Sequence, residues 1–282
     1  MIRSLGLAWT FRVLGIIALL VNAISTALIN DRNAVIGSSQ IAFDTKLLRR
    51  VEFLLLLGFG CFSIFGYVIL NFSLADYATK VGLSTSQSVL VGSLFSLGQA
   101  IGRPLLGYFS DRTGRINMST VSTMLAGIFC LVVWVQAKTY GVLILFSIIS
   151  GCVAGTFWTT IGPVATEVVG LRTIPSALCM IWLVIVPAAL FSEPIALQIV
   201  AGTGSYFGAQ VFAGLTYIMA GLCLLVLRGW KISETDEITR ILGVDARQID
   251  RANMEMNEEL SGRGSRVGRK MMMTTWWKVR KV

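Results

Sequence analysis

The sequence predicts an all-α membrane protein with seven membrane-spanning helices. The chain has 282 residues, of which 55% are hydrophobic and only 14% are charged. Apolar runs of about twenty residues recur along it, and a helix of that length crosses the hydrocarbon core of a bilayer. Helices are expected because a helix satisfies its own backbone hydrogen bonds in lipid. The predicted spans are 9–29, 53–75, 87–109, 117–137, 140–163, 174–198 and 205–228.

The basic residues indicate how the chain is oriented. With an outside N-terminus, 20 of the 24 lysines and arginines lie in inward-facing segments. Cytoplasmic loops carry an excess of these residues, so the distribution predicts a cytosolic C-terminal tail. The predicted order is a spanning helix at 1–30, a cytosolic linker at 31–52, a six-helix bundle at 53–228 and a partly disordered cytosolic tail at 229–282. A secretory signal is the alternative for the first segment, but the length of its apolar run disfavours that interpretation.

The linker at 31–52 carries both charge signs and contains no proline. Its end, around Phe43–Val51, is predicted to form a short amphipathic helix. Leu47, Leu48 and Val51 would then lie on the membrane, while the neighbouring cations reach the lipid head groups. A merely solvated linker explains the same residues equally well.

The third predicted span contains the candidate binding residues. On a helix Ser96, Gln99 and Arg103 share one face, opposite a face of leucine and isoleucine. A cation at membrane depth costs roughly 2.5–3.5 kcal/mol on insertion scales, and it marks a functional site by default. Arg103 is therefore the first candidate for binding an anionic group. The alternative is that Arg103 only snorkels to the inner head groups, since it lies eight residues before Asp111.

Two polar residues in other spans are weaker candidates. Asn71, in the second span, is a possible cavity residue, although a single interhelical hydrogen bond would also explain it. Glu193 lies near the predicted outer end of the sixth span, where either a vestibule or ordinary interfacial solvent would accommodate it.

Several other function classes find no support in the sequence. The five cysteines are scattered singly inside predicted spans, and there is no histidine, so no ordinary zinc site is expected. No nucleophile–base pair is visible, which disfavours an enzyme, and no cofactor is implied. The net charge of +9 is concentrated in the predicted cytosolic segments, which argues against a nucleic-acid partner.

The third span ends in a charged, glycine-containing turn that reads GYFSDRTGR from Gly107 to Arg115. Heptahelical receptors also have seven spans and an Asp-Arg-Tyr triplet at this place. The glycines that flank Asp111-Arg112, and the lack of a cysteine at the outer start of the span, disfavour a receptor. The run instead resembles the G-x-x-x-D-R-x-G-R loop signature of the major facilitator superfamily, which joins the second and third helices of a six-helix half.

Here the signature joins the third and fourth spans. The resemblance therefore implies that the first span corresponds to the sixth helix of a twelve-helix transporter. Residues 31–52 would be its central loop, and 53–228 its C-terminal half. On this reading the chain is a truncated transporter that lacks the first five helices.

A finer resemblance is to the monocarboxylate-transporter-like branch, particularly its fungal members. Arg103-Pro104 matches an Arg-Pro pair of that branch, and the stretches SLGLAWTFR, FWTTIGPV and FSEPIAL are also similar. In that branch an acidic residue lies four positions before the Arg-Pro pair. The residue here is Gln99, so the proton carrier of a lactate-type symporter is missing from its usual place.

The resemblance implies transport of a small organic solute, a monocarboxylate or related anion, by alternating access. Substrate would bind at Arg103, Gln99, Ser96 and Asn71. The gating loop would consist of Gly107, Asp111, Arg112, Gly114 and Arg115, although a simple tight cytosolic turn would explain the same residues. Expected partners are the solute, membrane lipid, and a missing N-terminal half or a second transporter chain. The alternative is a non-transporting half-transporter or membrane interaction protein.

Overall fold

All regular secondary structure in the described part of the protein is helical, as predicted. The computed structural model describes residues 2–28, 41 and 43–242, and these contain no strand. Seven helical segments are long and apolar enough to cross a membrane, which confirms the predicted integral, multi-pass class. The helices are α1 (Ile2–Leu28), α3 (Val51–Lys80), α4 (Thr85–Thr113), α5 (Arg115–Phe129), α6 (Tyr140–Ala154), α7 (Thr156–Val169), α8 (Ile174–Thr203) and α9 (Phe207–Leu242), with short turns η1 (Leu47–Arg49) and η2 (Cys130–Trp134).

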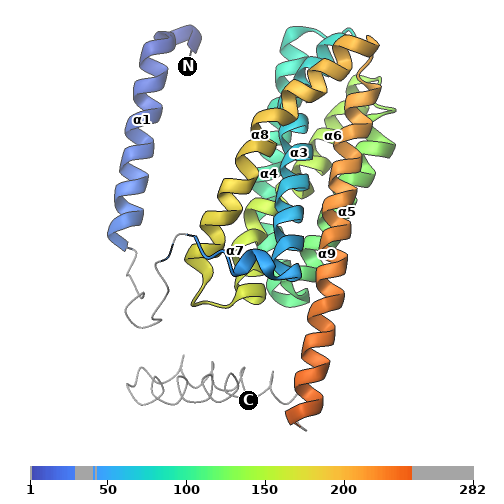
Figure 1. Ribbon diagram of the computed structural model, residues 1–282. Coiled ribbons are helices and arrows are strands. Elements are labelled where there is room, and N and C mark those ends of the chain that lie inside the picture. Colours follow the sequence, from blue (N-terminus) through green and yellow to red (C-terminus); the bar gives the residue numbers. More distant parts are fainter. Residues whose placement is uncertain (1, 29–40, 42, 243–282) are drawn as a thin grey trace.

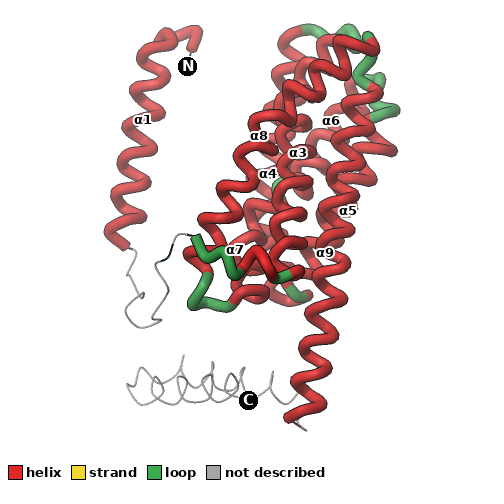
Figure 2. The backbone as a smooth tube through the Cα atoms, in the orientation of Figure 1, coloured by secondary structure: helices red, strands yellow, loops and turns green. Residues whose placement is uncertain are grey.

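The helices from α3 to α9 form one bundle, and α1 stands beside it (Figure 1). The most extensive pairings are α4 with α6, α3 with α9, and α5 with α9. No residue in the most apolar window of α1 is buried. The end of the bundle that contains the turn at Gly114 is called the signature end below. It lies at the bottom of Figures 1 and 2, where short loops join the helices.

Small residues allow α4 and α6 to pack backbone against backbone. A Cβ atom added at Gly102 would lie 2.3 Å from the carbonyl oxygen of Cys152, and one at Gly98 would lie 2.5 Å from that of Ile148. From the other side, a Cβ at Gly151 would lie 2.4 Å from the carbonyl oxygen of Phe95. Only glycine fits such distances. Small residues at this contact therefore allow α4 and α6 to approach closely, as is common between membrane helices.

The fifth predicted span is interrupted. Gly155 separates α6 from α7 in the middle of the segment Tyr140–Val169. Interrupted helices at membrane depth are tolerated where the break is buried in protein or lines a cavity. Gly155 is buried, and it packs against the side chain of Arg103 on α4. The break thus marks the level of the bundle at which a cation is held.

The predicted amphipathic helix at Phe43–Val51 is not observed as such. The structure has only the single turn η1 there, and α3 begins directly afterwards at Val51. The prediction for Leu47 was wrong, because its side chain is 2% exposed and belongs to the apolar core instead of lying on a membrane surface. Leu48 and Val51 are exposed, as expected. The predictions for most of the linker and for the tail beyond Leu242 fall outside the described residues.

Two apolar clusters form the core of the bundle. One occupies the signature end and contains Phe53, Phe157 and Ile181; the other occupies the opposite end and contains Phe95 and Trp134. Tyr67 packs against the second cluster, whereas Phe157 belongs to the first. The polar residues around Tyr67 therefore lie between the two clusters, within the depth of the membrane.

Candidate functional site

The candidate site is built on the side chain of Arg103, whose guanidinium is held by two uncharged groups. Its Nη2 atom donates a hydrogen bond to Oε1 of Gln99 at 2.7 Å, and it lies 3.4 Å from the hydroxyl of Tyr67. The Tyr67 hydroxyl in turn donates to Oε1 of Gln99 at 3.0 Å. The amide oxygen of Gln99 thus accepts from both neighbours and orients the guanidinium.

Helical periodicity brings Gln99 and Arg103 together on α4, and packing of α3 against α4 adds Tyr67. Gln99 and Arg103 are one turn apart on α4, and Tyr67 reaches them from α3. Gly155 leaves room for the guanidinium, because a Cβ there would lie 3.1 Å from its Nε atom. Arg103 is roughly 15 Å of helix from the signature end of α4, which keeps it within a hydrocarbon core of about 30 Å.

The charge of Arg103 is not neutralised by the described part of the chain. Three ion pairs occur among the described residues, and none includes Arg103. Its Nε atom is buried and has no hydrogen-bond partner in the structure. A buried donor without an acceptor costs about 1–3 kcal/mol, and more when the group is charged. An anion bound at this guanidinium would recover part of that cost.

Aromatic rings from three helices extend the site. The ring of Tyr67 meets that of Trp158 on α7 edge to face, with centroids 5.9 Å apart. Trp158 stacks on Trp182 of α8 at 5.7 Å, with 27° between the planes. Phe157 is 1% exposed and packs edge-on against both indoles. The two tryptophans remain 40% and 41% exposed, so the aromatic group is open on one side.

Two of the four predicted binding residues lie elsewhere. Ser96 is exposed, and its hydroxyl donates to the carbonyl oxygen of Gly92 on its own helix. Asn71 is also exposed, one helical turn from Tyr67 toward the opposite end of α3. The structure therefore brings Gln99 and Arg103 together, as their spacing suggested, but it places Ser96 and Asn71 outside this hydrogen-bonded group.

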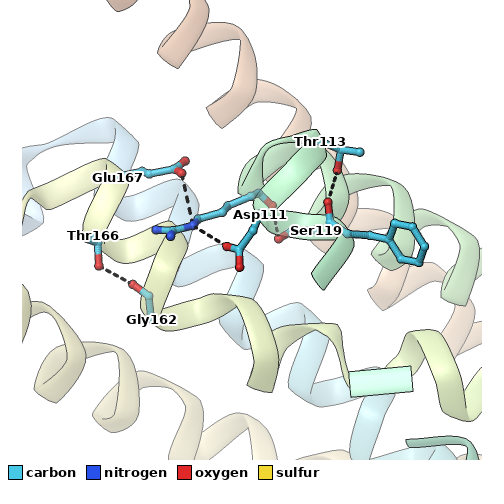
Figure 3. A network of polar contacts seen from close by, with 8 residues as sticks. Asp111, Thr113, Ser119, Gly162, Thr166 and Glu167 are labelled. Atoms are coloured by element: carbon cyan, nitrogen blue, oxygen red, sulfur yellow. Dashed lines mark hydrogen bonds and ion pairs between the residues drawn. The ribbon is translucent and has the colours of Figure 1, made fainter. Parts of the chain in front are cut away.

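Two of the predicted gating residues, Asp111 and Arg115, form a second, separate cluster with Glu167 at the signature end (Figure 3). The Nε atom of Arg115 lies 3.5 Å from Oδ1 of Asp111 and 3.9 Å from Oε1 of Glu167, which comes from the end of α7. Lys231 of α9 donates to the backbone carbonyl of Glu167 at 3.2 Å. The cluster therefore joins the end of α4, the start of α5, the end of α7 and the interior of α9.

The remaining residues of the signature shape this turn. Gly114 has φ +94°, a conformation that other residues adopt rarely, and it separates α4 from α5 without a longer loop. The guanidinium of Arg112 lies over the ring of Tyr108, 4.5 Å from its centroid, instead of pairing with a carboxylate. At Gly107 an added Cβ would make only an ordinary contact with Thr159 of α7, at 3.8 Å, so the packing there does not require glycine.

A third polar group lies near the opposite end of the bundle. Ser73 of α3 donates to Glu193 of α8 at 2.8 Å, and Tyr206 donates to Asp76. Burial and the hydrogen bond to Asp76 raise the pKa of Tyr206. Glu193 is thus tied to α3 by a hydrogen bond that the sequence did not predict.

Sequence reasoning missed Tyr67, Trp158, Trp182 and Glu167. The three aromatic residues look like ordinary apolar positions in a membrane helix, and no motif links α3, α7 and α8. Glu167 lies just beyond the predicted fifth span and was not singled out. One signal was available in the sequence: Tyr67, Trp158 and Trp182 each have a polar atom, which is unusual for a side chain that faces only lipid tails.

Comparison with known proteins agrees with this architecture. The family model for the Major Facilitator Superfamily matches residues 1–184 and 54–241. The probable transporter MCH2 of Saccharomyces cerevisiae is 28% identical over 221 residues, which cover 77% of this chain and 46% of that protein. An MFS-type transporter of Gibberella moniliformis is 28% identical over 243 residues, covering 82% of this chain and 58% of that protein.

A further relative carries the name of a substrate class. Human monocarboxylate transporter 12 is 30% identical over 173 residues, or 60% of this chain and 32% of that protein. The chain therefore spans from about a third to just over half the length of these three relatives. All three are described as transporters, and they agree with the monocarboxylate-transporter-like branch to which the sequence motifs point. The match to the family model extends over most of the chain, which belongs to the Major Facilitator Superfamily.

Proposed function

We propose that this chain takes part in the transmembrane transport of a small organic anion, such as a monocarboxylate, and that Arg103 binds the anionic group. The observation that carries the proposal is the guanidinium of Arg103, which is held at membrane depth by Gln99 and Tyr67 and has no carboxylate partner among the described residues. A guanidinium binds a carboxylate through charge-assisted hydrogen bonds, which are stronger than neutral ones.

Transport would proceed by alternating access between two bundles. In transporters of this kind the substrate binds near the bilayer midplane at the interface of two repeats. Residues 53–228 would be the C-terminal six-helix bundle, and α1 the helix that precedes it. Trp158 and Trp182 are about 40% exposed, so the site is open on the side where a second bundle would close it.

The charged signature end would act as the inner gate. Asp111, Arg112 and Arg115 would pair with helix ends of the second bundle in one of the two conformations, and the signature end and the tail would face the cytosol. In the described bundle Arg115 instead pairs with Asp111 and Glu167. Exchange of such partners is one way in which two conformations of similar free energy are interconverted.

A direct binding measurement tests the role of Arg103. The chain is purified into lipid nanodiscs and titrated with radiolabelled lactate, cyclohexanecarboxylate and benzoate. Saturable binding of at least one of them, lost in Arg103→Ala and kept in Arg112→Ala, supports the proposal. Arg112 is the matched control because its guanidinium lies over Tyr108 at the signature end, away from the site. Equal binding by both variants, or no binding of any carboxylate, contradicts it.

The alternative is a membrane interaction protein that has the transporter fold but no transport activity of its own. The observation in its favour is the open side of the site. Proteoliposomes that contain only this chain are expected to show no saturable counterflow of a carboxylate that the chain binds. Binding without counterflow supports a half-site that needs a second bundle, whereas counterflow by the chain alone would show that copies of it complete the site.

A further inference from the structure

The indole rings near Arg103 form an exposed, stacked aromatic pair at the depth of the cation. Trp158 and Trp182 are stacked on each other and are 40% and 41% exposed, although they lie in the middle of the bundle wall. Trp182 is eight residues from the start of α8, roughly 12 Å of helix, so it lies at nearly the same depth as Arg103. The exposed rings and the cation are therefore at one level of the membrane.

The rings are connected to the cation without interruption. Arg103 lies 3.4 Å from the hydroxyl of Tyr67, the ring of Tyr67 meets Trp158 at 5.9 Å, and Trp158 meets Trp182 at 5.7 Å. Phe157, which is almost fully buried, packs against both indoles from behind and keeps their planes in place. A preorganised aromatic surface thus begins at the guanidinium and extends away from it.

Lipid contact alone does not account for this surface. Several large exposed side chains of α8 near Trp182 are aliphatic, at Leu183, Val186 and Leu190, and the exposed aromatic Phe191 lies farther along the helix. An indole also presents an N–H group, and among the described residues neither Trp158 nor Trp182 has a hydrogen-bond partner for it. Lipid tails offer no acceptor for these groups, so the indoles are unusual side chains for a surface that faces only lipid.

From this arrangement we infer that the substrate of the site is a planar aromatic carboxylate, with its anionic group at Arg103 and its ring on the indole surface of Trp158 and Trp182. Ring systems prefer offset-stacked or edge-to-face contacts, which both exposed indoles offer. The inference rests on the proposed function, since it names the substrate class of the same site. A saturated ring of equal charge and similar size would keep the contact with the cation but lose the aromatic one.

The test compares benzoate with cyclohexanecarboxylate and with uncharged benzyl alcohol, using the full chain in nanodiscs and competition against the tightest radiolabelled carboxylate. Benzoate is expected to bind roughly two- to tenfold more tightly than cyclohexanecarboxylate, which corresponds to the usual worth of one aromatic contact. Benzyl alcohol is expected to compete only weakly, because it lacks the anionic group.

Variants of the two tryptophans test whether the preference for benzoate over cyclohexanecarboxylate comes from the indole rings. Trp182→Leu should remove the preference for benzoate and leave the affinity for cyclohexanecarboxylate within about twofold. Phe191→Leu is the matched control, since Phe191 lies on the same helix and is 55% exposed, and it should keep the preference. Trp158→Leu gives a second, independent reading if Trp182→Leu fails to fold.

Different results would overturn the aromatic substrate class and the proposed anion binding at Arg103. Equal affinities for benzoate and cyclohexanecarboxylate in the unaltered chain, both lost in Arg103→Ala, would overturn the aromatic class and leave anion binding standing. Benzyl alcohol binding as tightly as benzoate would show that the indoles take up a neutral ring without the cation, which also overturns the inference. Absence of carboxylate binding altogether would overturn the proposed function.

Discussion

Arg103 and Arg115 are close in the sequence, yet the structure gives them opposite surroundings. Arg115 lies between two carboxylates, Asp111 and Glu167, at the end of the bundle. Arg103 lies at membrane depth and contacts only the amide of Gln99 and the hydroxyl of Tyr67. The arginine that pairs with carboxylates joins helix ends, whereas the one held by uncharged groups has no anionic partner among the described residues.

The first prediction concerns the side of the membrane that the signature end of the bundle faces. In a background without the native cysteines, Thr113→Cys at the signature end should be protected from an impermeant thiol reagent in intact cells, and Thr79→Cys at the opposite end should react. The expected effect is all or none, because the two positions lie at opposite ends of the bundle. Labelling of position 113 from outside would reverse the proposed orientation.

The second prediction contrasts conservative changes at the two arginines. Arg103→Lys keeps the charge but loses the planar two-bond geometry, and anion affinity should fall roughly ten- to a hundredfold, as expected for a lost charge-assisted hydrogen bond. Arg115→Lys should leave the affinity within about twofold. Equilibrium binding in nanodiscs measures both. Normal affinity in Arg103→Lys would instead support snorkelling, since a flexible ammonium reaches head groups as readily.

The third prediction makes Arg103 resemble Arg115. Gln99→Glu would place a carboxylate one turn from the guanidinium and neutralise it internally, so anion affinity should fall several-fold at neutral pH. The pair with Arg103 favours the ionised carboxylate, so protonation at low pH should free the cation again. Affinity should therefore rise as pH falls, and the unaltered chain should lack this dependence. Identical pH profiles would place the anion site elsewhere.

The fourth prediction tests the space left for the guanidinium. A Cβ in Gly155→Ala would lie 3.1 Å from Nε of Arg103, so the side chain must shift by a few tenths of an ångström. A loss of affinity of a few-fold is expected, with helix content unchanged in circular dichroism. Gly162→Ala, within α7 just after Gly155, is the matched control, because an added Cβ there meets nothing within 4 Å. Equal affinities in the two variants would mean that the fit at Gly155 is not needed for binding.

The smallest effect is expected at the signature end. The side chain of Arg115 is 38% exposed and that of Asp111 is 70% exposed, so the pair between them is worth at most about 1 kcal/mol. Arg115→Gln should lower the midpoint of thermal unfolding by no more than a few degrees, and less at high salt. Arg112→Gln serves for comparison, since Arg112 contacts the ring of Tyr108. A loss of anion binding in Arg115→Gln as large as in Arg103→Ala would remove the distinction drawn between the two arginines.

Local information in the sequence was enough for the class of the fold and for the contact between Gln99 and Arg103. Apolar runs of about twenty residues have one stable solution in a bilayer, so the seven spans could be recognised without any knowledge of packing. Gln99 and Arg103 meet because they are one turn apart on a single helix, and helical periodicity alone determines that. Gly114 could be recognised as a turn for a similar reason, since glycine adopts positive φ at little cost.

Contacts between helices were decided only by the tertiary structure. Tyr67 joins Arg103, and Glu167 joins Arg115, across helices whose mutual rotation and depth depend on the summed packing of small residues such as Gly98 and Gly102. Leu47 was assigned to a membrane surface because its pattern is amphipathic, but a place in the apolar core was available to it. Short-range patterns in the sequence thus determined which helices form, whereas the packing of distant segments determined which side chains surround each cation.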